Sequence, residues 1–564
     1  MSSKYLADKQ ITSVDINESR INHHLSLRKK EYYKMINNKR KIFSEINSLF
    51  QNISDLPNSS DKLLNNNIFK ILSNQQILEI IDNLKKQELS IKNNLTEISQ
   101  CLFSLDFNIN QNLLNSIKFI EDNKIYIFLI DFLDKIFNSS CEQYLNIHSI
   151  EQLINKTLQI LVKYSSDKEN NSKMVNYINN DNKINIFNQI ISSLAYNNKT
   201  NNNNSQHNII INNNKKTDIL IYLNIILYNL SIISNDLFKK LQKNKIEEKL
   251  ISIIIDKKNN LKIDDNNIIY FIAFFSLNLL SENIINKEET YILNIFQFLN
   301  QKGITSLNQK AQELSLCCLC NITSSYESDT FYKKIIYSGI FDNIFQVIKI
   351  SKSIYPILVS LKIVNNILTE KNIDLNYFIN SNLLKGLINL MNNYEKNKQN
   401  LTPDLLHHII SIFLYLTKSP LFYSLINSDN ELTLIKILIN LIGIISNKVT
   451  HDILTFIKDI MEESYKISQL IIYYNKELII KLINIIKEDC HNYKITTMSA
   501  IILAKILRYL HENNNKEKKC NTIDFKEYES QIKEIVEVKI LNENEINENL
   551  KKTFQILLNI IEDK

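Results

Sequence analysis

The chain has 564 residues, a formal net charge of +6 and 44% hydrophobic residues, but only four glycines and four prolines. It is too long for one compact hydrophobic core, and it has too few turn-forming residues for a β-sandwich or an α/β fold, which need them about every dozen positions. These properties favour an elongated architecture of successive α-helices.

Cysteine usage and hydropathy indicate the compartment. Seven cysteines without paired spacing, and no apolar signal segment at the start, predict a reducing compartment, that is, the cytosol or the nucleus. The longest apolar run, "IIYFIAFFSLNLL" at 268–280, is shorter than the roughly 20 residues that a membrane helix needs. We therefore expect no membrane-spanning segment.

The first 70 residues form a basic arm. They contain twelve Lys/Arg and seven Asp/Glu, a net charge of +5, so the remaining chain contributes only +1. Residues 17–36 fit an amphipathic helix with Ile21, Leu25 and Arg28 on one side. Such a helix suits an acidic protein partner. One short basic helix without a basic body is a poor footprint for nucleic acid, and a solvated tail is the simpler alternative.

After the arm, an apolar helix with a central asparagine recurs along the chain. The spacing of 43 to 49 residues is close to the period of armadillo or HEAT repeats, in which helices stack around a continuous core. We predict armadillo repeats over residues 71–510 and a C-terminal capping repeat over 511–564. The central positions are Asn229, Asn278, Asn321 and Asn366, continued by Tyr415 and Asp459 and preceded by Val162.

Two features interrupt the repeat pattern. The step from Val162 to Asn229 is 67 residues, and the polar tract that begins "NNKTNNNNSQHN" predicts a disordered loop at about 197–216 in this interval. Within the helical pairs at 331–350 and 375–393, Gly339 and Gly386 mark the expected break between two helices.

The asparagines suggest a binding function. A carboxamide both donates and accepts hydrogen bonds, so a row of them can hold an extended peptide by its backbone, and the residue four positions earlier lies beside each one. Chance placement of a common residue is the alternative. The predicted cargo-binding residues are Asn229, Asn278, Asn321 and Asn366 with Phe274, Cys317 and Lys362.

Several segments resemble the importin-α family of armadillo adaptors. "SLKIVNNILTEKNIDLNYFI" and "LCCLCNITSSYESDTFYKKIIYSGIFDNIFQVI" are similar to its repeats, and "YESQIKEIVEVKILNENEINENLKKTFQILLNII" is similar to its last repeat and terminal helix. The resemblance implies an all-α, right-handed superhelical armadillo solenoid. It also implies a nuclear import adaptor of the cytoplasm and nucleus that binds nuclear-localisation-signal cargo, with an export receptor possible at the C-terminal repeats.

The arm carries the most specific part of this resemblance. "RINHHLSLRKKEYYKMINNKRK", residues 20–41, is similar to the family's importin-β-binding segment. The resemblance implies that Lys39, Arg40 and Lys41 occupy the peptide groove as an internal pseudo-cargo until importin-β removes them. The residues in register with the importin-β-binding pattern are Arg20, Ile21, Leu27, Arg28, Lys29, Lys39 and Arg40.

The groove departs from the family pattern. The family pairs each asparagine with a tryptophan four residues earlier, whose ring covers a cargo lysine, but this chain contains no tryptophan. The groove therefore binds basic signals weakly, binds a different cargo, or leaves binding to the arm and C-terminal repeats. The matching positions are Leu158, Ile225, Phe274, Cys317, Ser411 and Thr455.

No enzyme signature is present. A phosphate-binding glycine loop is absent, and adjacent histidines such as His407 and His408 point about 100° apart on a helix, so we expect ordinary surface or groove residues. Cys317, Cys318 and Cys320 lack partners at zinc spacing and are expected to be buried apolar side chains. We expect no enzyme, no cofactor and no metal, and the alternative function is an armadillo scaffold of the cytoskeleton or signalling.

Overall fold

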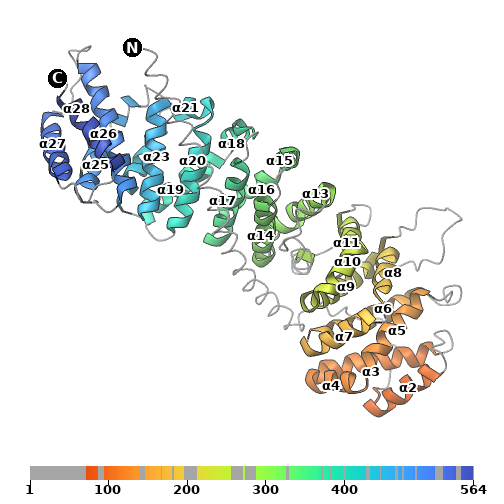
Figure 1. Ribbon diagram of the computed structural model, residues 1–564. Helices are drawn as coiled ribbons and strands as arrows, with labels where there is room; N and C mark the ends of the chain where they lie inside the picture. The colour runs from red at the N-terminus through yellow and green to blue at the C-terminus, as the bar shows by residue number, and fades with distance from the viewer. Residues whose placement is uncertain are drawn as a thin grey trace. The chain divides into compact units, whose positions relative to one another are not determined.

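The computed structural model falls into two compact units, residues 1–326 and 327–564, which we describe separately (Figure 1). Within the described residues every regular element is a helix and no strand occurs. The predicted basic arm, residues 1–70, lies outside the described residues. The described ranges are 71–86, 94–138, 147–166, 168–180, 183–195, 213–255, 268, 271–272, 288–325, 329–369, 373–381, 383–397, 402–426, 432–444, 446–463, 468–469, 471–472, 476–488, 492–514, 525–541 and 548–562.

In the first unit, short helices alternate with longer ones in a three-helix pattern. A π-helical segment, Leu299–Ile304, directly follows α13. The helices are α2 Asn74–Lys86, α3 Leu95–Gln111, α4 Leu113–Asp122, α5 Ile125–Asn138, α6 Ile147–Ser165, α7 Lys168–Asn180, α8 Ile184–Ala195, α9 Asn213–Ile233, α10 Asn235–Lys243, α11 Ile246–Ile255, α13 Glu289–Phe298 and α14 Gln309–Ser325.

The second unit repeats the same pattern and ends with two further helices, α27 and α28. Its helices are α15 Asp329–Tyr337, α16 Ile340–Ile350, α17 Ile354–Leu368, α18 Leu375–Asn380, α19 Leu383–Asn397, α20 Pro403–Leu416, α21 Pro420–Ile426, α22 Leu432–Leu441, α23 Asn447–Glu463, α25 Lys476–Glu488, α26 Tyr493–Asn514, α27 Phe525–Leu541 and α28 Glu548–Glu562.

Local sequence explains where several helices begin. Thr402 precedes Pro403, and its Oγ1 accepts a hydrogen bond from the backbone N–H of Leu405 at 3.3 Å, which caps the start of α20. Ser234 caps α10 in the same way, because its Oγ accepts from the N–H of Leu237 at 3.1 Å. Each cap satisfies a backbone donor that the helix itself leaves without a partner.

The last helices of successive repeats pack side by side. In the first unit α3 contacts α6, and α6 contacts α9; in the second unit α17, α20, α23 and α26 contact one another in that order. We call these helices the third-helix row of each unit. Apart from the copy around Asn278, which lies outside the described residues, the predicted asparagine-centred segments and their substituted copies all lie on α6, α9, α14, α17, α20 or α23, so the sequence period is confirmed.

The structure confirms one predicted helix boundary, at Gly339, and contradicts the other, at Gly386. Gly339 has φ of 75° and separates α15 from α16, as predicted. Gly386 instead lies inside α19, and the break falls at Ser381, whose Oγ accepts from the N–H of Leu383 at 3.2 Å. The prediction that a helix breaks at Gly386 was therefore wrong, because the break lies before α19, at Ser381.

The helix α9 begins earlier than predicted, and most of it is apolar and buried. It begins at Asn213, so the last part of the loop predicted at 197–216 is helical, while residues 196–212 lie outside the described residues. By length and composition, its window Lys216–Ile233 is apolar enough to cross a membrane, and 78% of this window is buried in the protein. Packing against α6, α7, α8 and α10 accounts for that apolar composition.

Candidate functional site

The half-exposed face of α17 carries two of the predicted cargo-binding residues. Lys362 and Asn366 lie one turn apart and are both half-buried, and Thr369 follows on the same face. The Oγ1 of Thr369 donates a hydrogen bond to the backbone O of Asn366 at 2.6 Å. An ammonium and a carboxamide are thus adjacent on the side of α17 that reaches solvent.

The neighbouring Asn365 has a different role, which sequence reasoning missed. Its side chain is buried, and its Nδ2 lies 3.0 Å from the backbone O and 3.1 Å from Nδ1 of His408 on α20. Asn365 therefore joins two helices of the row, whereas Asn366 faces outward. The two side chains have different surroundings because adjacent residues on a helix point about 100° apart.

A second contact joins α20 to α23. His407 Nδ1 donates a hydrogen bond to Asp452 Oδ2 at 2.5 Å, and His451 Nδ1 lies 3.9 Å from Oδ1 of the same carboxylate. Burial opposes ionisation of Asp452, but hydrogen bonds and charge from the two histidines outweigh it, so the pKa of Asp452 lies below its ordinary value. His407 and His408 are both buried and contact neighbouring helices, whereas the sequence predicted ordinary surface or groove residues.

A third contact joins α23 to α26. Glu462 on α23 accepts from Lys505 on α26, and Lys458 lies 3.3 Å from the same carboxylate oxygen. Polar side chains therefore link each neighbouring pair in the third-helix row of the second unit.

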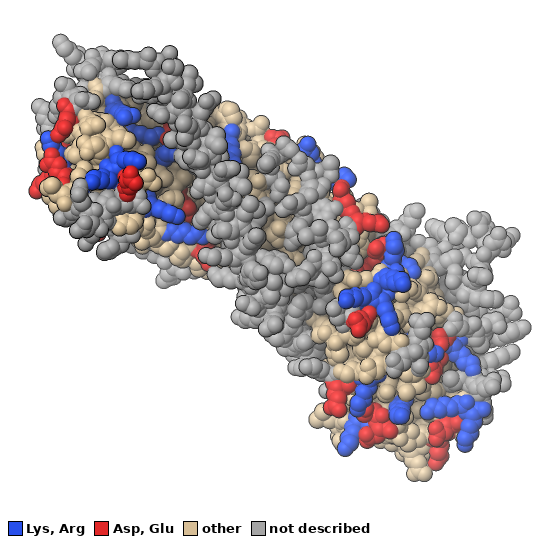
Figure 2. All heavy atoms as spheres, in the orientation of Figure 1, with Lys and Arg blue, Asp and Glu red and all other residues tan. Residues whose placement is uncertain are grey.

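On the face drawn in Figure 2, described Lys and Arg side chains are interspersed with Asp and Glu in both units.

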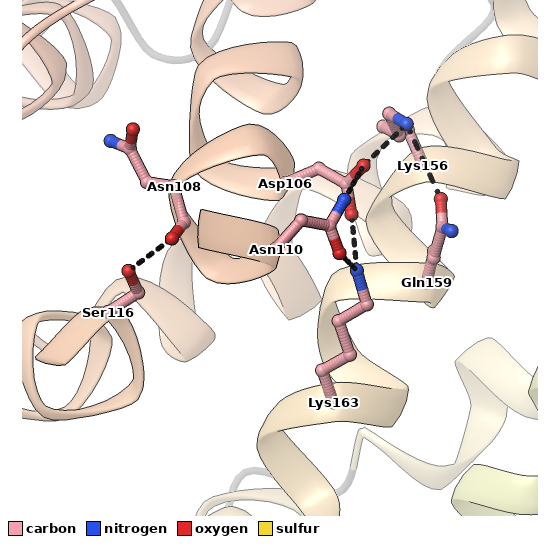
Figure 3. Close-up of polar contacts among 7 residues, drawn as sticks. All are labelled: Asp106, Asn108, Asn110, Ser116, Lys156, Gln159 and Lys163. Carbon is pink, nitrogen blue, oxygen red and sulfur yellow. Dashed lines mark hydrogen bonds and ion pairs between the residues drawn. The ribbon is translucent and has the colours of Figure 1, made fainter. Parts of the chain in front are cut away.

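The first unit has a corresponding ion cluster between α3 and α6 (Figure 3). Asp106 on α3 accepts hydrogen bonds from Lys156 at 2.7 Å and from Lys163 at 2.8 Å, both on α6. Asn110 Oδ1 accepts from Lys163 at 2.6 Å, and Gln159 Oε1 lies 3.4 Å from the ammonium of Lys156. The cluster holds two positive charges against one carboxylate in a largely buried position.

This cluster corrects the predicted phase of α6. Leu158 and Val162, assigned from sequence to the tryptophan and asparagine positions, are both 0% exposed and lie in the core. The residues one position later, Gln159 and Lys163, lie on the polar face instead. A shift of one residue rotates a helix position by about 100°, which is enough to exchange the polar face for the core.

Two of the four predicted cargo-binding asparagines, Asn229 and Asn321, are buried. Asn229 on α9 is 7% exposed, and its Nδ2 donates to Ser165 Oγ on α6 at 3.0 Å, while its backbone O accepts from Asn171 Nδ2 at 2.6 Å. Asn321 on α14 is only 2% exposed. Their carboxamides therefore do not lie open to an incoming peptide.

The cysteines of α14 are buried, as predicted from their lack of partners at zinc spacing. Cys317, Cys318 and Cys320 are all buried and none forms a disulfide. Burial raises the pKa of the Cys318 thiol well above its ordinary value, which keeps it in its protonated, unreactive form. Among the described residues, no group of three or more His, Cys, Asp or Glu side chains is placed to hold a metal ion.

The remaining predicted site residues lie outside the described residues. They are Phe274 and Asn278 in the repeat following α11, and Arg20, Ile21, Leu27, Arg28, Lys29, Lys39 and Arg40 in the arm.

Comparison with known proteins gives the fold. No protein-family model matches the sequence, and no curated protein matches it. A solved structure described as "A conserved phosphorylation switch controls the interaction between cadherin and beta-catenin in vitro and in vivo" aligns over 91% of this chain and 91% of its own, with a TM-score of 0.50 and 10% identity.

Two artificial proteins are also similar. A designed armadillo repeat protein covers 47% of this chain and 99% of its own, at 15% identity and a TM-score of 0.34. An engineered protein covers 86% of this chain and 99% of its own, at 12% identity and a TM-score of 0.44. With the three-helix period, the alignment to the cadherin and beta-catenin structure shows that the fold is an all-α, armadillo-like repeat solenoid.

Proposed function

We propose that this chain is a nuclear import adaptor. Its third-helix rows bind a cargo peptide that carries a nuclear-localisation signal, residues 20–41 bind importin-β, and the protein shuttles between cytoplasm and nucleus without enzymatic activity. The observation that carries the proposal is the half-exposed pair Lys362 and Asn366 on α17, within a row of packed third helices that follows a basic arm.

The arm is the part that separates this function from other uses of the fold. Arg28 and Lys29 follow Leu27 in the segment that resembles an importin-β-binding sequence. Two adjacent basic residues of this kind bind an acidic partner through charge-assisted hydrogen bonds. An armadillo protein that does not interact with importin-β has no need of this triplet.

A pull-down of the full-length chain with purified importin-β tests the proposal. We expect wild type to bind and an Arg28→Ala/Lys29→Ala variant to lose most of the binding. The matched control is Lys4→Ala/Lys9→Ala, which removes the same charge from the arm outside residues 20–41 and should bind as wild type does. Absence of binding by wild type overturns the adaptor function.

A second candidate is an armadillo scaffold that binds another protein in the cytoskeleton or in signalling. Its support is the alignment with the structure described by the interaction between cadherin and beta-catenin. The chain lacks the tryptophans that cover cargo lysines in the import adaptors it resembles, which also favours a different partner. This candidate predicts that the Arg28/Lys29 variant and wild type behave alike in the pull-down.

A further inference from the structure

Two adjacent histidines on α20 bind opposite neighbours in the third-helix row of the second unit. His407 contacts Asp452 on α23, and His408 contacts Asn365 on α17. Their ring centroids are 5.5 Å apart. The chemical nature of the two partners differs, so a proton has opposite consequences at the two contacts.

The backbone of α20 fixes the orientation of the Asn365 side chain. The backbone O of His408 is only an acceptor, so the Asn365 atom 3.0 Å from it must be the donating Nδ2. The same Nδ2 lies 3.1 Å from His408 Nδ1. Because the amide nitrogen has two hydrogens and no acceptor, Nδ1 must accept. This contact therefore requires neutral His408 with its proton on Nε2.

The contact of His407 has the reverse requirement. The partner of its Nδ1 is a carboxylate, which only accepts while it is ionised, and the pKa of Asp452 lies below the ordinary carboxyl value despite its burial. A positive charge on His407 strengthens this hydrogen bond. A proton gained by His407 would therefore preserve the link between α20 and α23.

Among the described residues of α17, α20 and α23, four other charged or titratable groups lie within one turn of these contacts. Lys362 lies one turn before Asn365, Asp404 lies one turn before His408, Lys448 lies one turn before Asp452, and His451 lies beside Asp452. A charge on both His407 and His408 would place two like charges on neighbouring rings.

We propose that the contact between α17 and α20 is an acid-sensitive joint that opens when His408 gains a proton, while the contact between α20 and α23 persists. A protonated Nδ1 would point an N–H at the N–H of Asn365, so the hydrogen bond is lost and a buried donor remains without its acceptor. The proposal depends on the helix contacts alone and not on a role in nuclear import.

Amide hydrogen exchange of the full-length chain, followed by mass spectrometry, tests this joint. After correction for the intrinsic pH dependence of exchange, amides of α17 should exchange about tenfold faster at about pH 5.5 than at about pH 7.5, while those of α23 keep their protection. Equal protection of α17 at both pH values overturns the proposal.

Two variants make the test specific. In His408→Asn the side-chain oxygen can replace Nδ1 as an acceptor that does not titrate, so the pH response of α17 should disappear. The control His451→Asn removes a nearby histidine outside the joint, and its response should remain. A response that persists in His408→Asn contradicts the proposal.

A measurement on wild type covers the case in which a variant does not fold. Exchange of the imidazole C2 proton gives the titration curve of each histidine separately. Loss of α17 protection should follow the curve of His408. If it follows His407 or His451 instead, the joint is not controlled by His408.

Discussion

Lys163 on α6 donates a hydrogen bond to Asp106 Oδ1 on α3 at 2.8 Å, with both side chains buried. The same carboxylate accepts from Lys156 at 2.7 Å, so Asp106 alone contacts side chains from separate turns of α6. Removal of ions from water is costly, and this cost is offset only when each charge has hydrogen-bonded partners. Asn110 supplies one more acceptor for Lys163, at 2.6 Å. The cluster therefore fixes how α3 and α6 pack.

We predict that Asp106→Asn destabilises the first unit by about 3 kcal/mol, because it leaves the buried ammonium of Lys163 without a counter-charge. The shift in the urea midpoint of helical circular dichroism measures this. Asp82→Asn is the matched control: Asp82 is exposed on α2, and the change should cost less than about 0.5 kcal/mol. Equal midpoints for wild type and Asp106→Asn would show that the cluster contributes nothing.

The same carboxylate predicts the direction of a pH dependence. Burial alone would raise the pKa of Asp106, but the charges and hydrogen bonds of Lys156 and Lys163 hold it below its ordinary value. A lowered pKa stabilises the fold above the unfolded-state pKa of about 3.9, and this contribution is lost as the pH falls through the folded-state pKa. The stability difference between wild type and Asp106→Asn should be constant near neutrality and shrink on acidification below about pH 4. A difference that grows in acid contradicts this sign.

Substitution by alanine should change the stability of the protein in opposite directions at two glycines. A Cβ added to Gly303 would collide with Oγ of Ser315 on α14 and lie 2.8 Å from its Cβ. Gly303→Ala should therefore cost about 1–3 kcal/mol through overpacking. Gly386 lies within α19 with no atom within 4 Å of an added Cβ, so Gly386→Ala should stabilise by about 0.5–1 kcal/mol through helix propensity. Urea unfolding of both variants measures these changes, and a shift in the same direction for both would contradict the packing assignment.

The repeat period could be predicted from sequence because it is a property of many residues together. Apolar helices recur every 43 to 49 residues, and a boundary error of a few positions does not hide that period. The helix phase could not be predicted in the same way. Leu158 and Val162 were assigned by matching their segment to the later copies of the repeat, and the true polar face, with Gln159 and Lys163, lies one residue further on.

The polar links within each row were also not predictable from sequence. Asn365 and Asn366 are identical side chains at consecutive positions, and only packing against α20 decides that the first binds His408 and the second reaches solvent. The contact of His407 with Asp452 joins residues 45 positions apart. Such pairs depend on how two helices cross, which the sequence of either helix alone does not specify.

The last prediction concerns the predicted cargo-binding asparagines, of which some are buried and Asn366 is half-exposed. Asn229 is buried and donates to Ser165 Oγ at 3.0 Å, so Asn229→Ala should destabilise the first unit by about 1–2 kcal/mol. Asn366 is half-exposed, and Asn366→Ala should change stability by less than about 0.5 kcal/mol.

For binding, the expectation is reversed. If Asn366 holds the backbone of an extended cargo peptide, Asn366→Ala should weaken the binding of a fluorescent basic signal peptide by roughly two- to tenfold, the value of one hydrogen bond. Asn229→Ala, assayed well below its unfolding midpoint, should bind the peptide as wild type does, because its carboxamide is used between α6 and α9. Fluorescence anisotropy measures both affinities. Weaker binding in Asn229→Ala with unchanged binding in Asn366→Ala would place the peptide on the first unit and remove Asn366 from the cargo site.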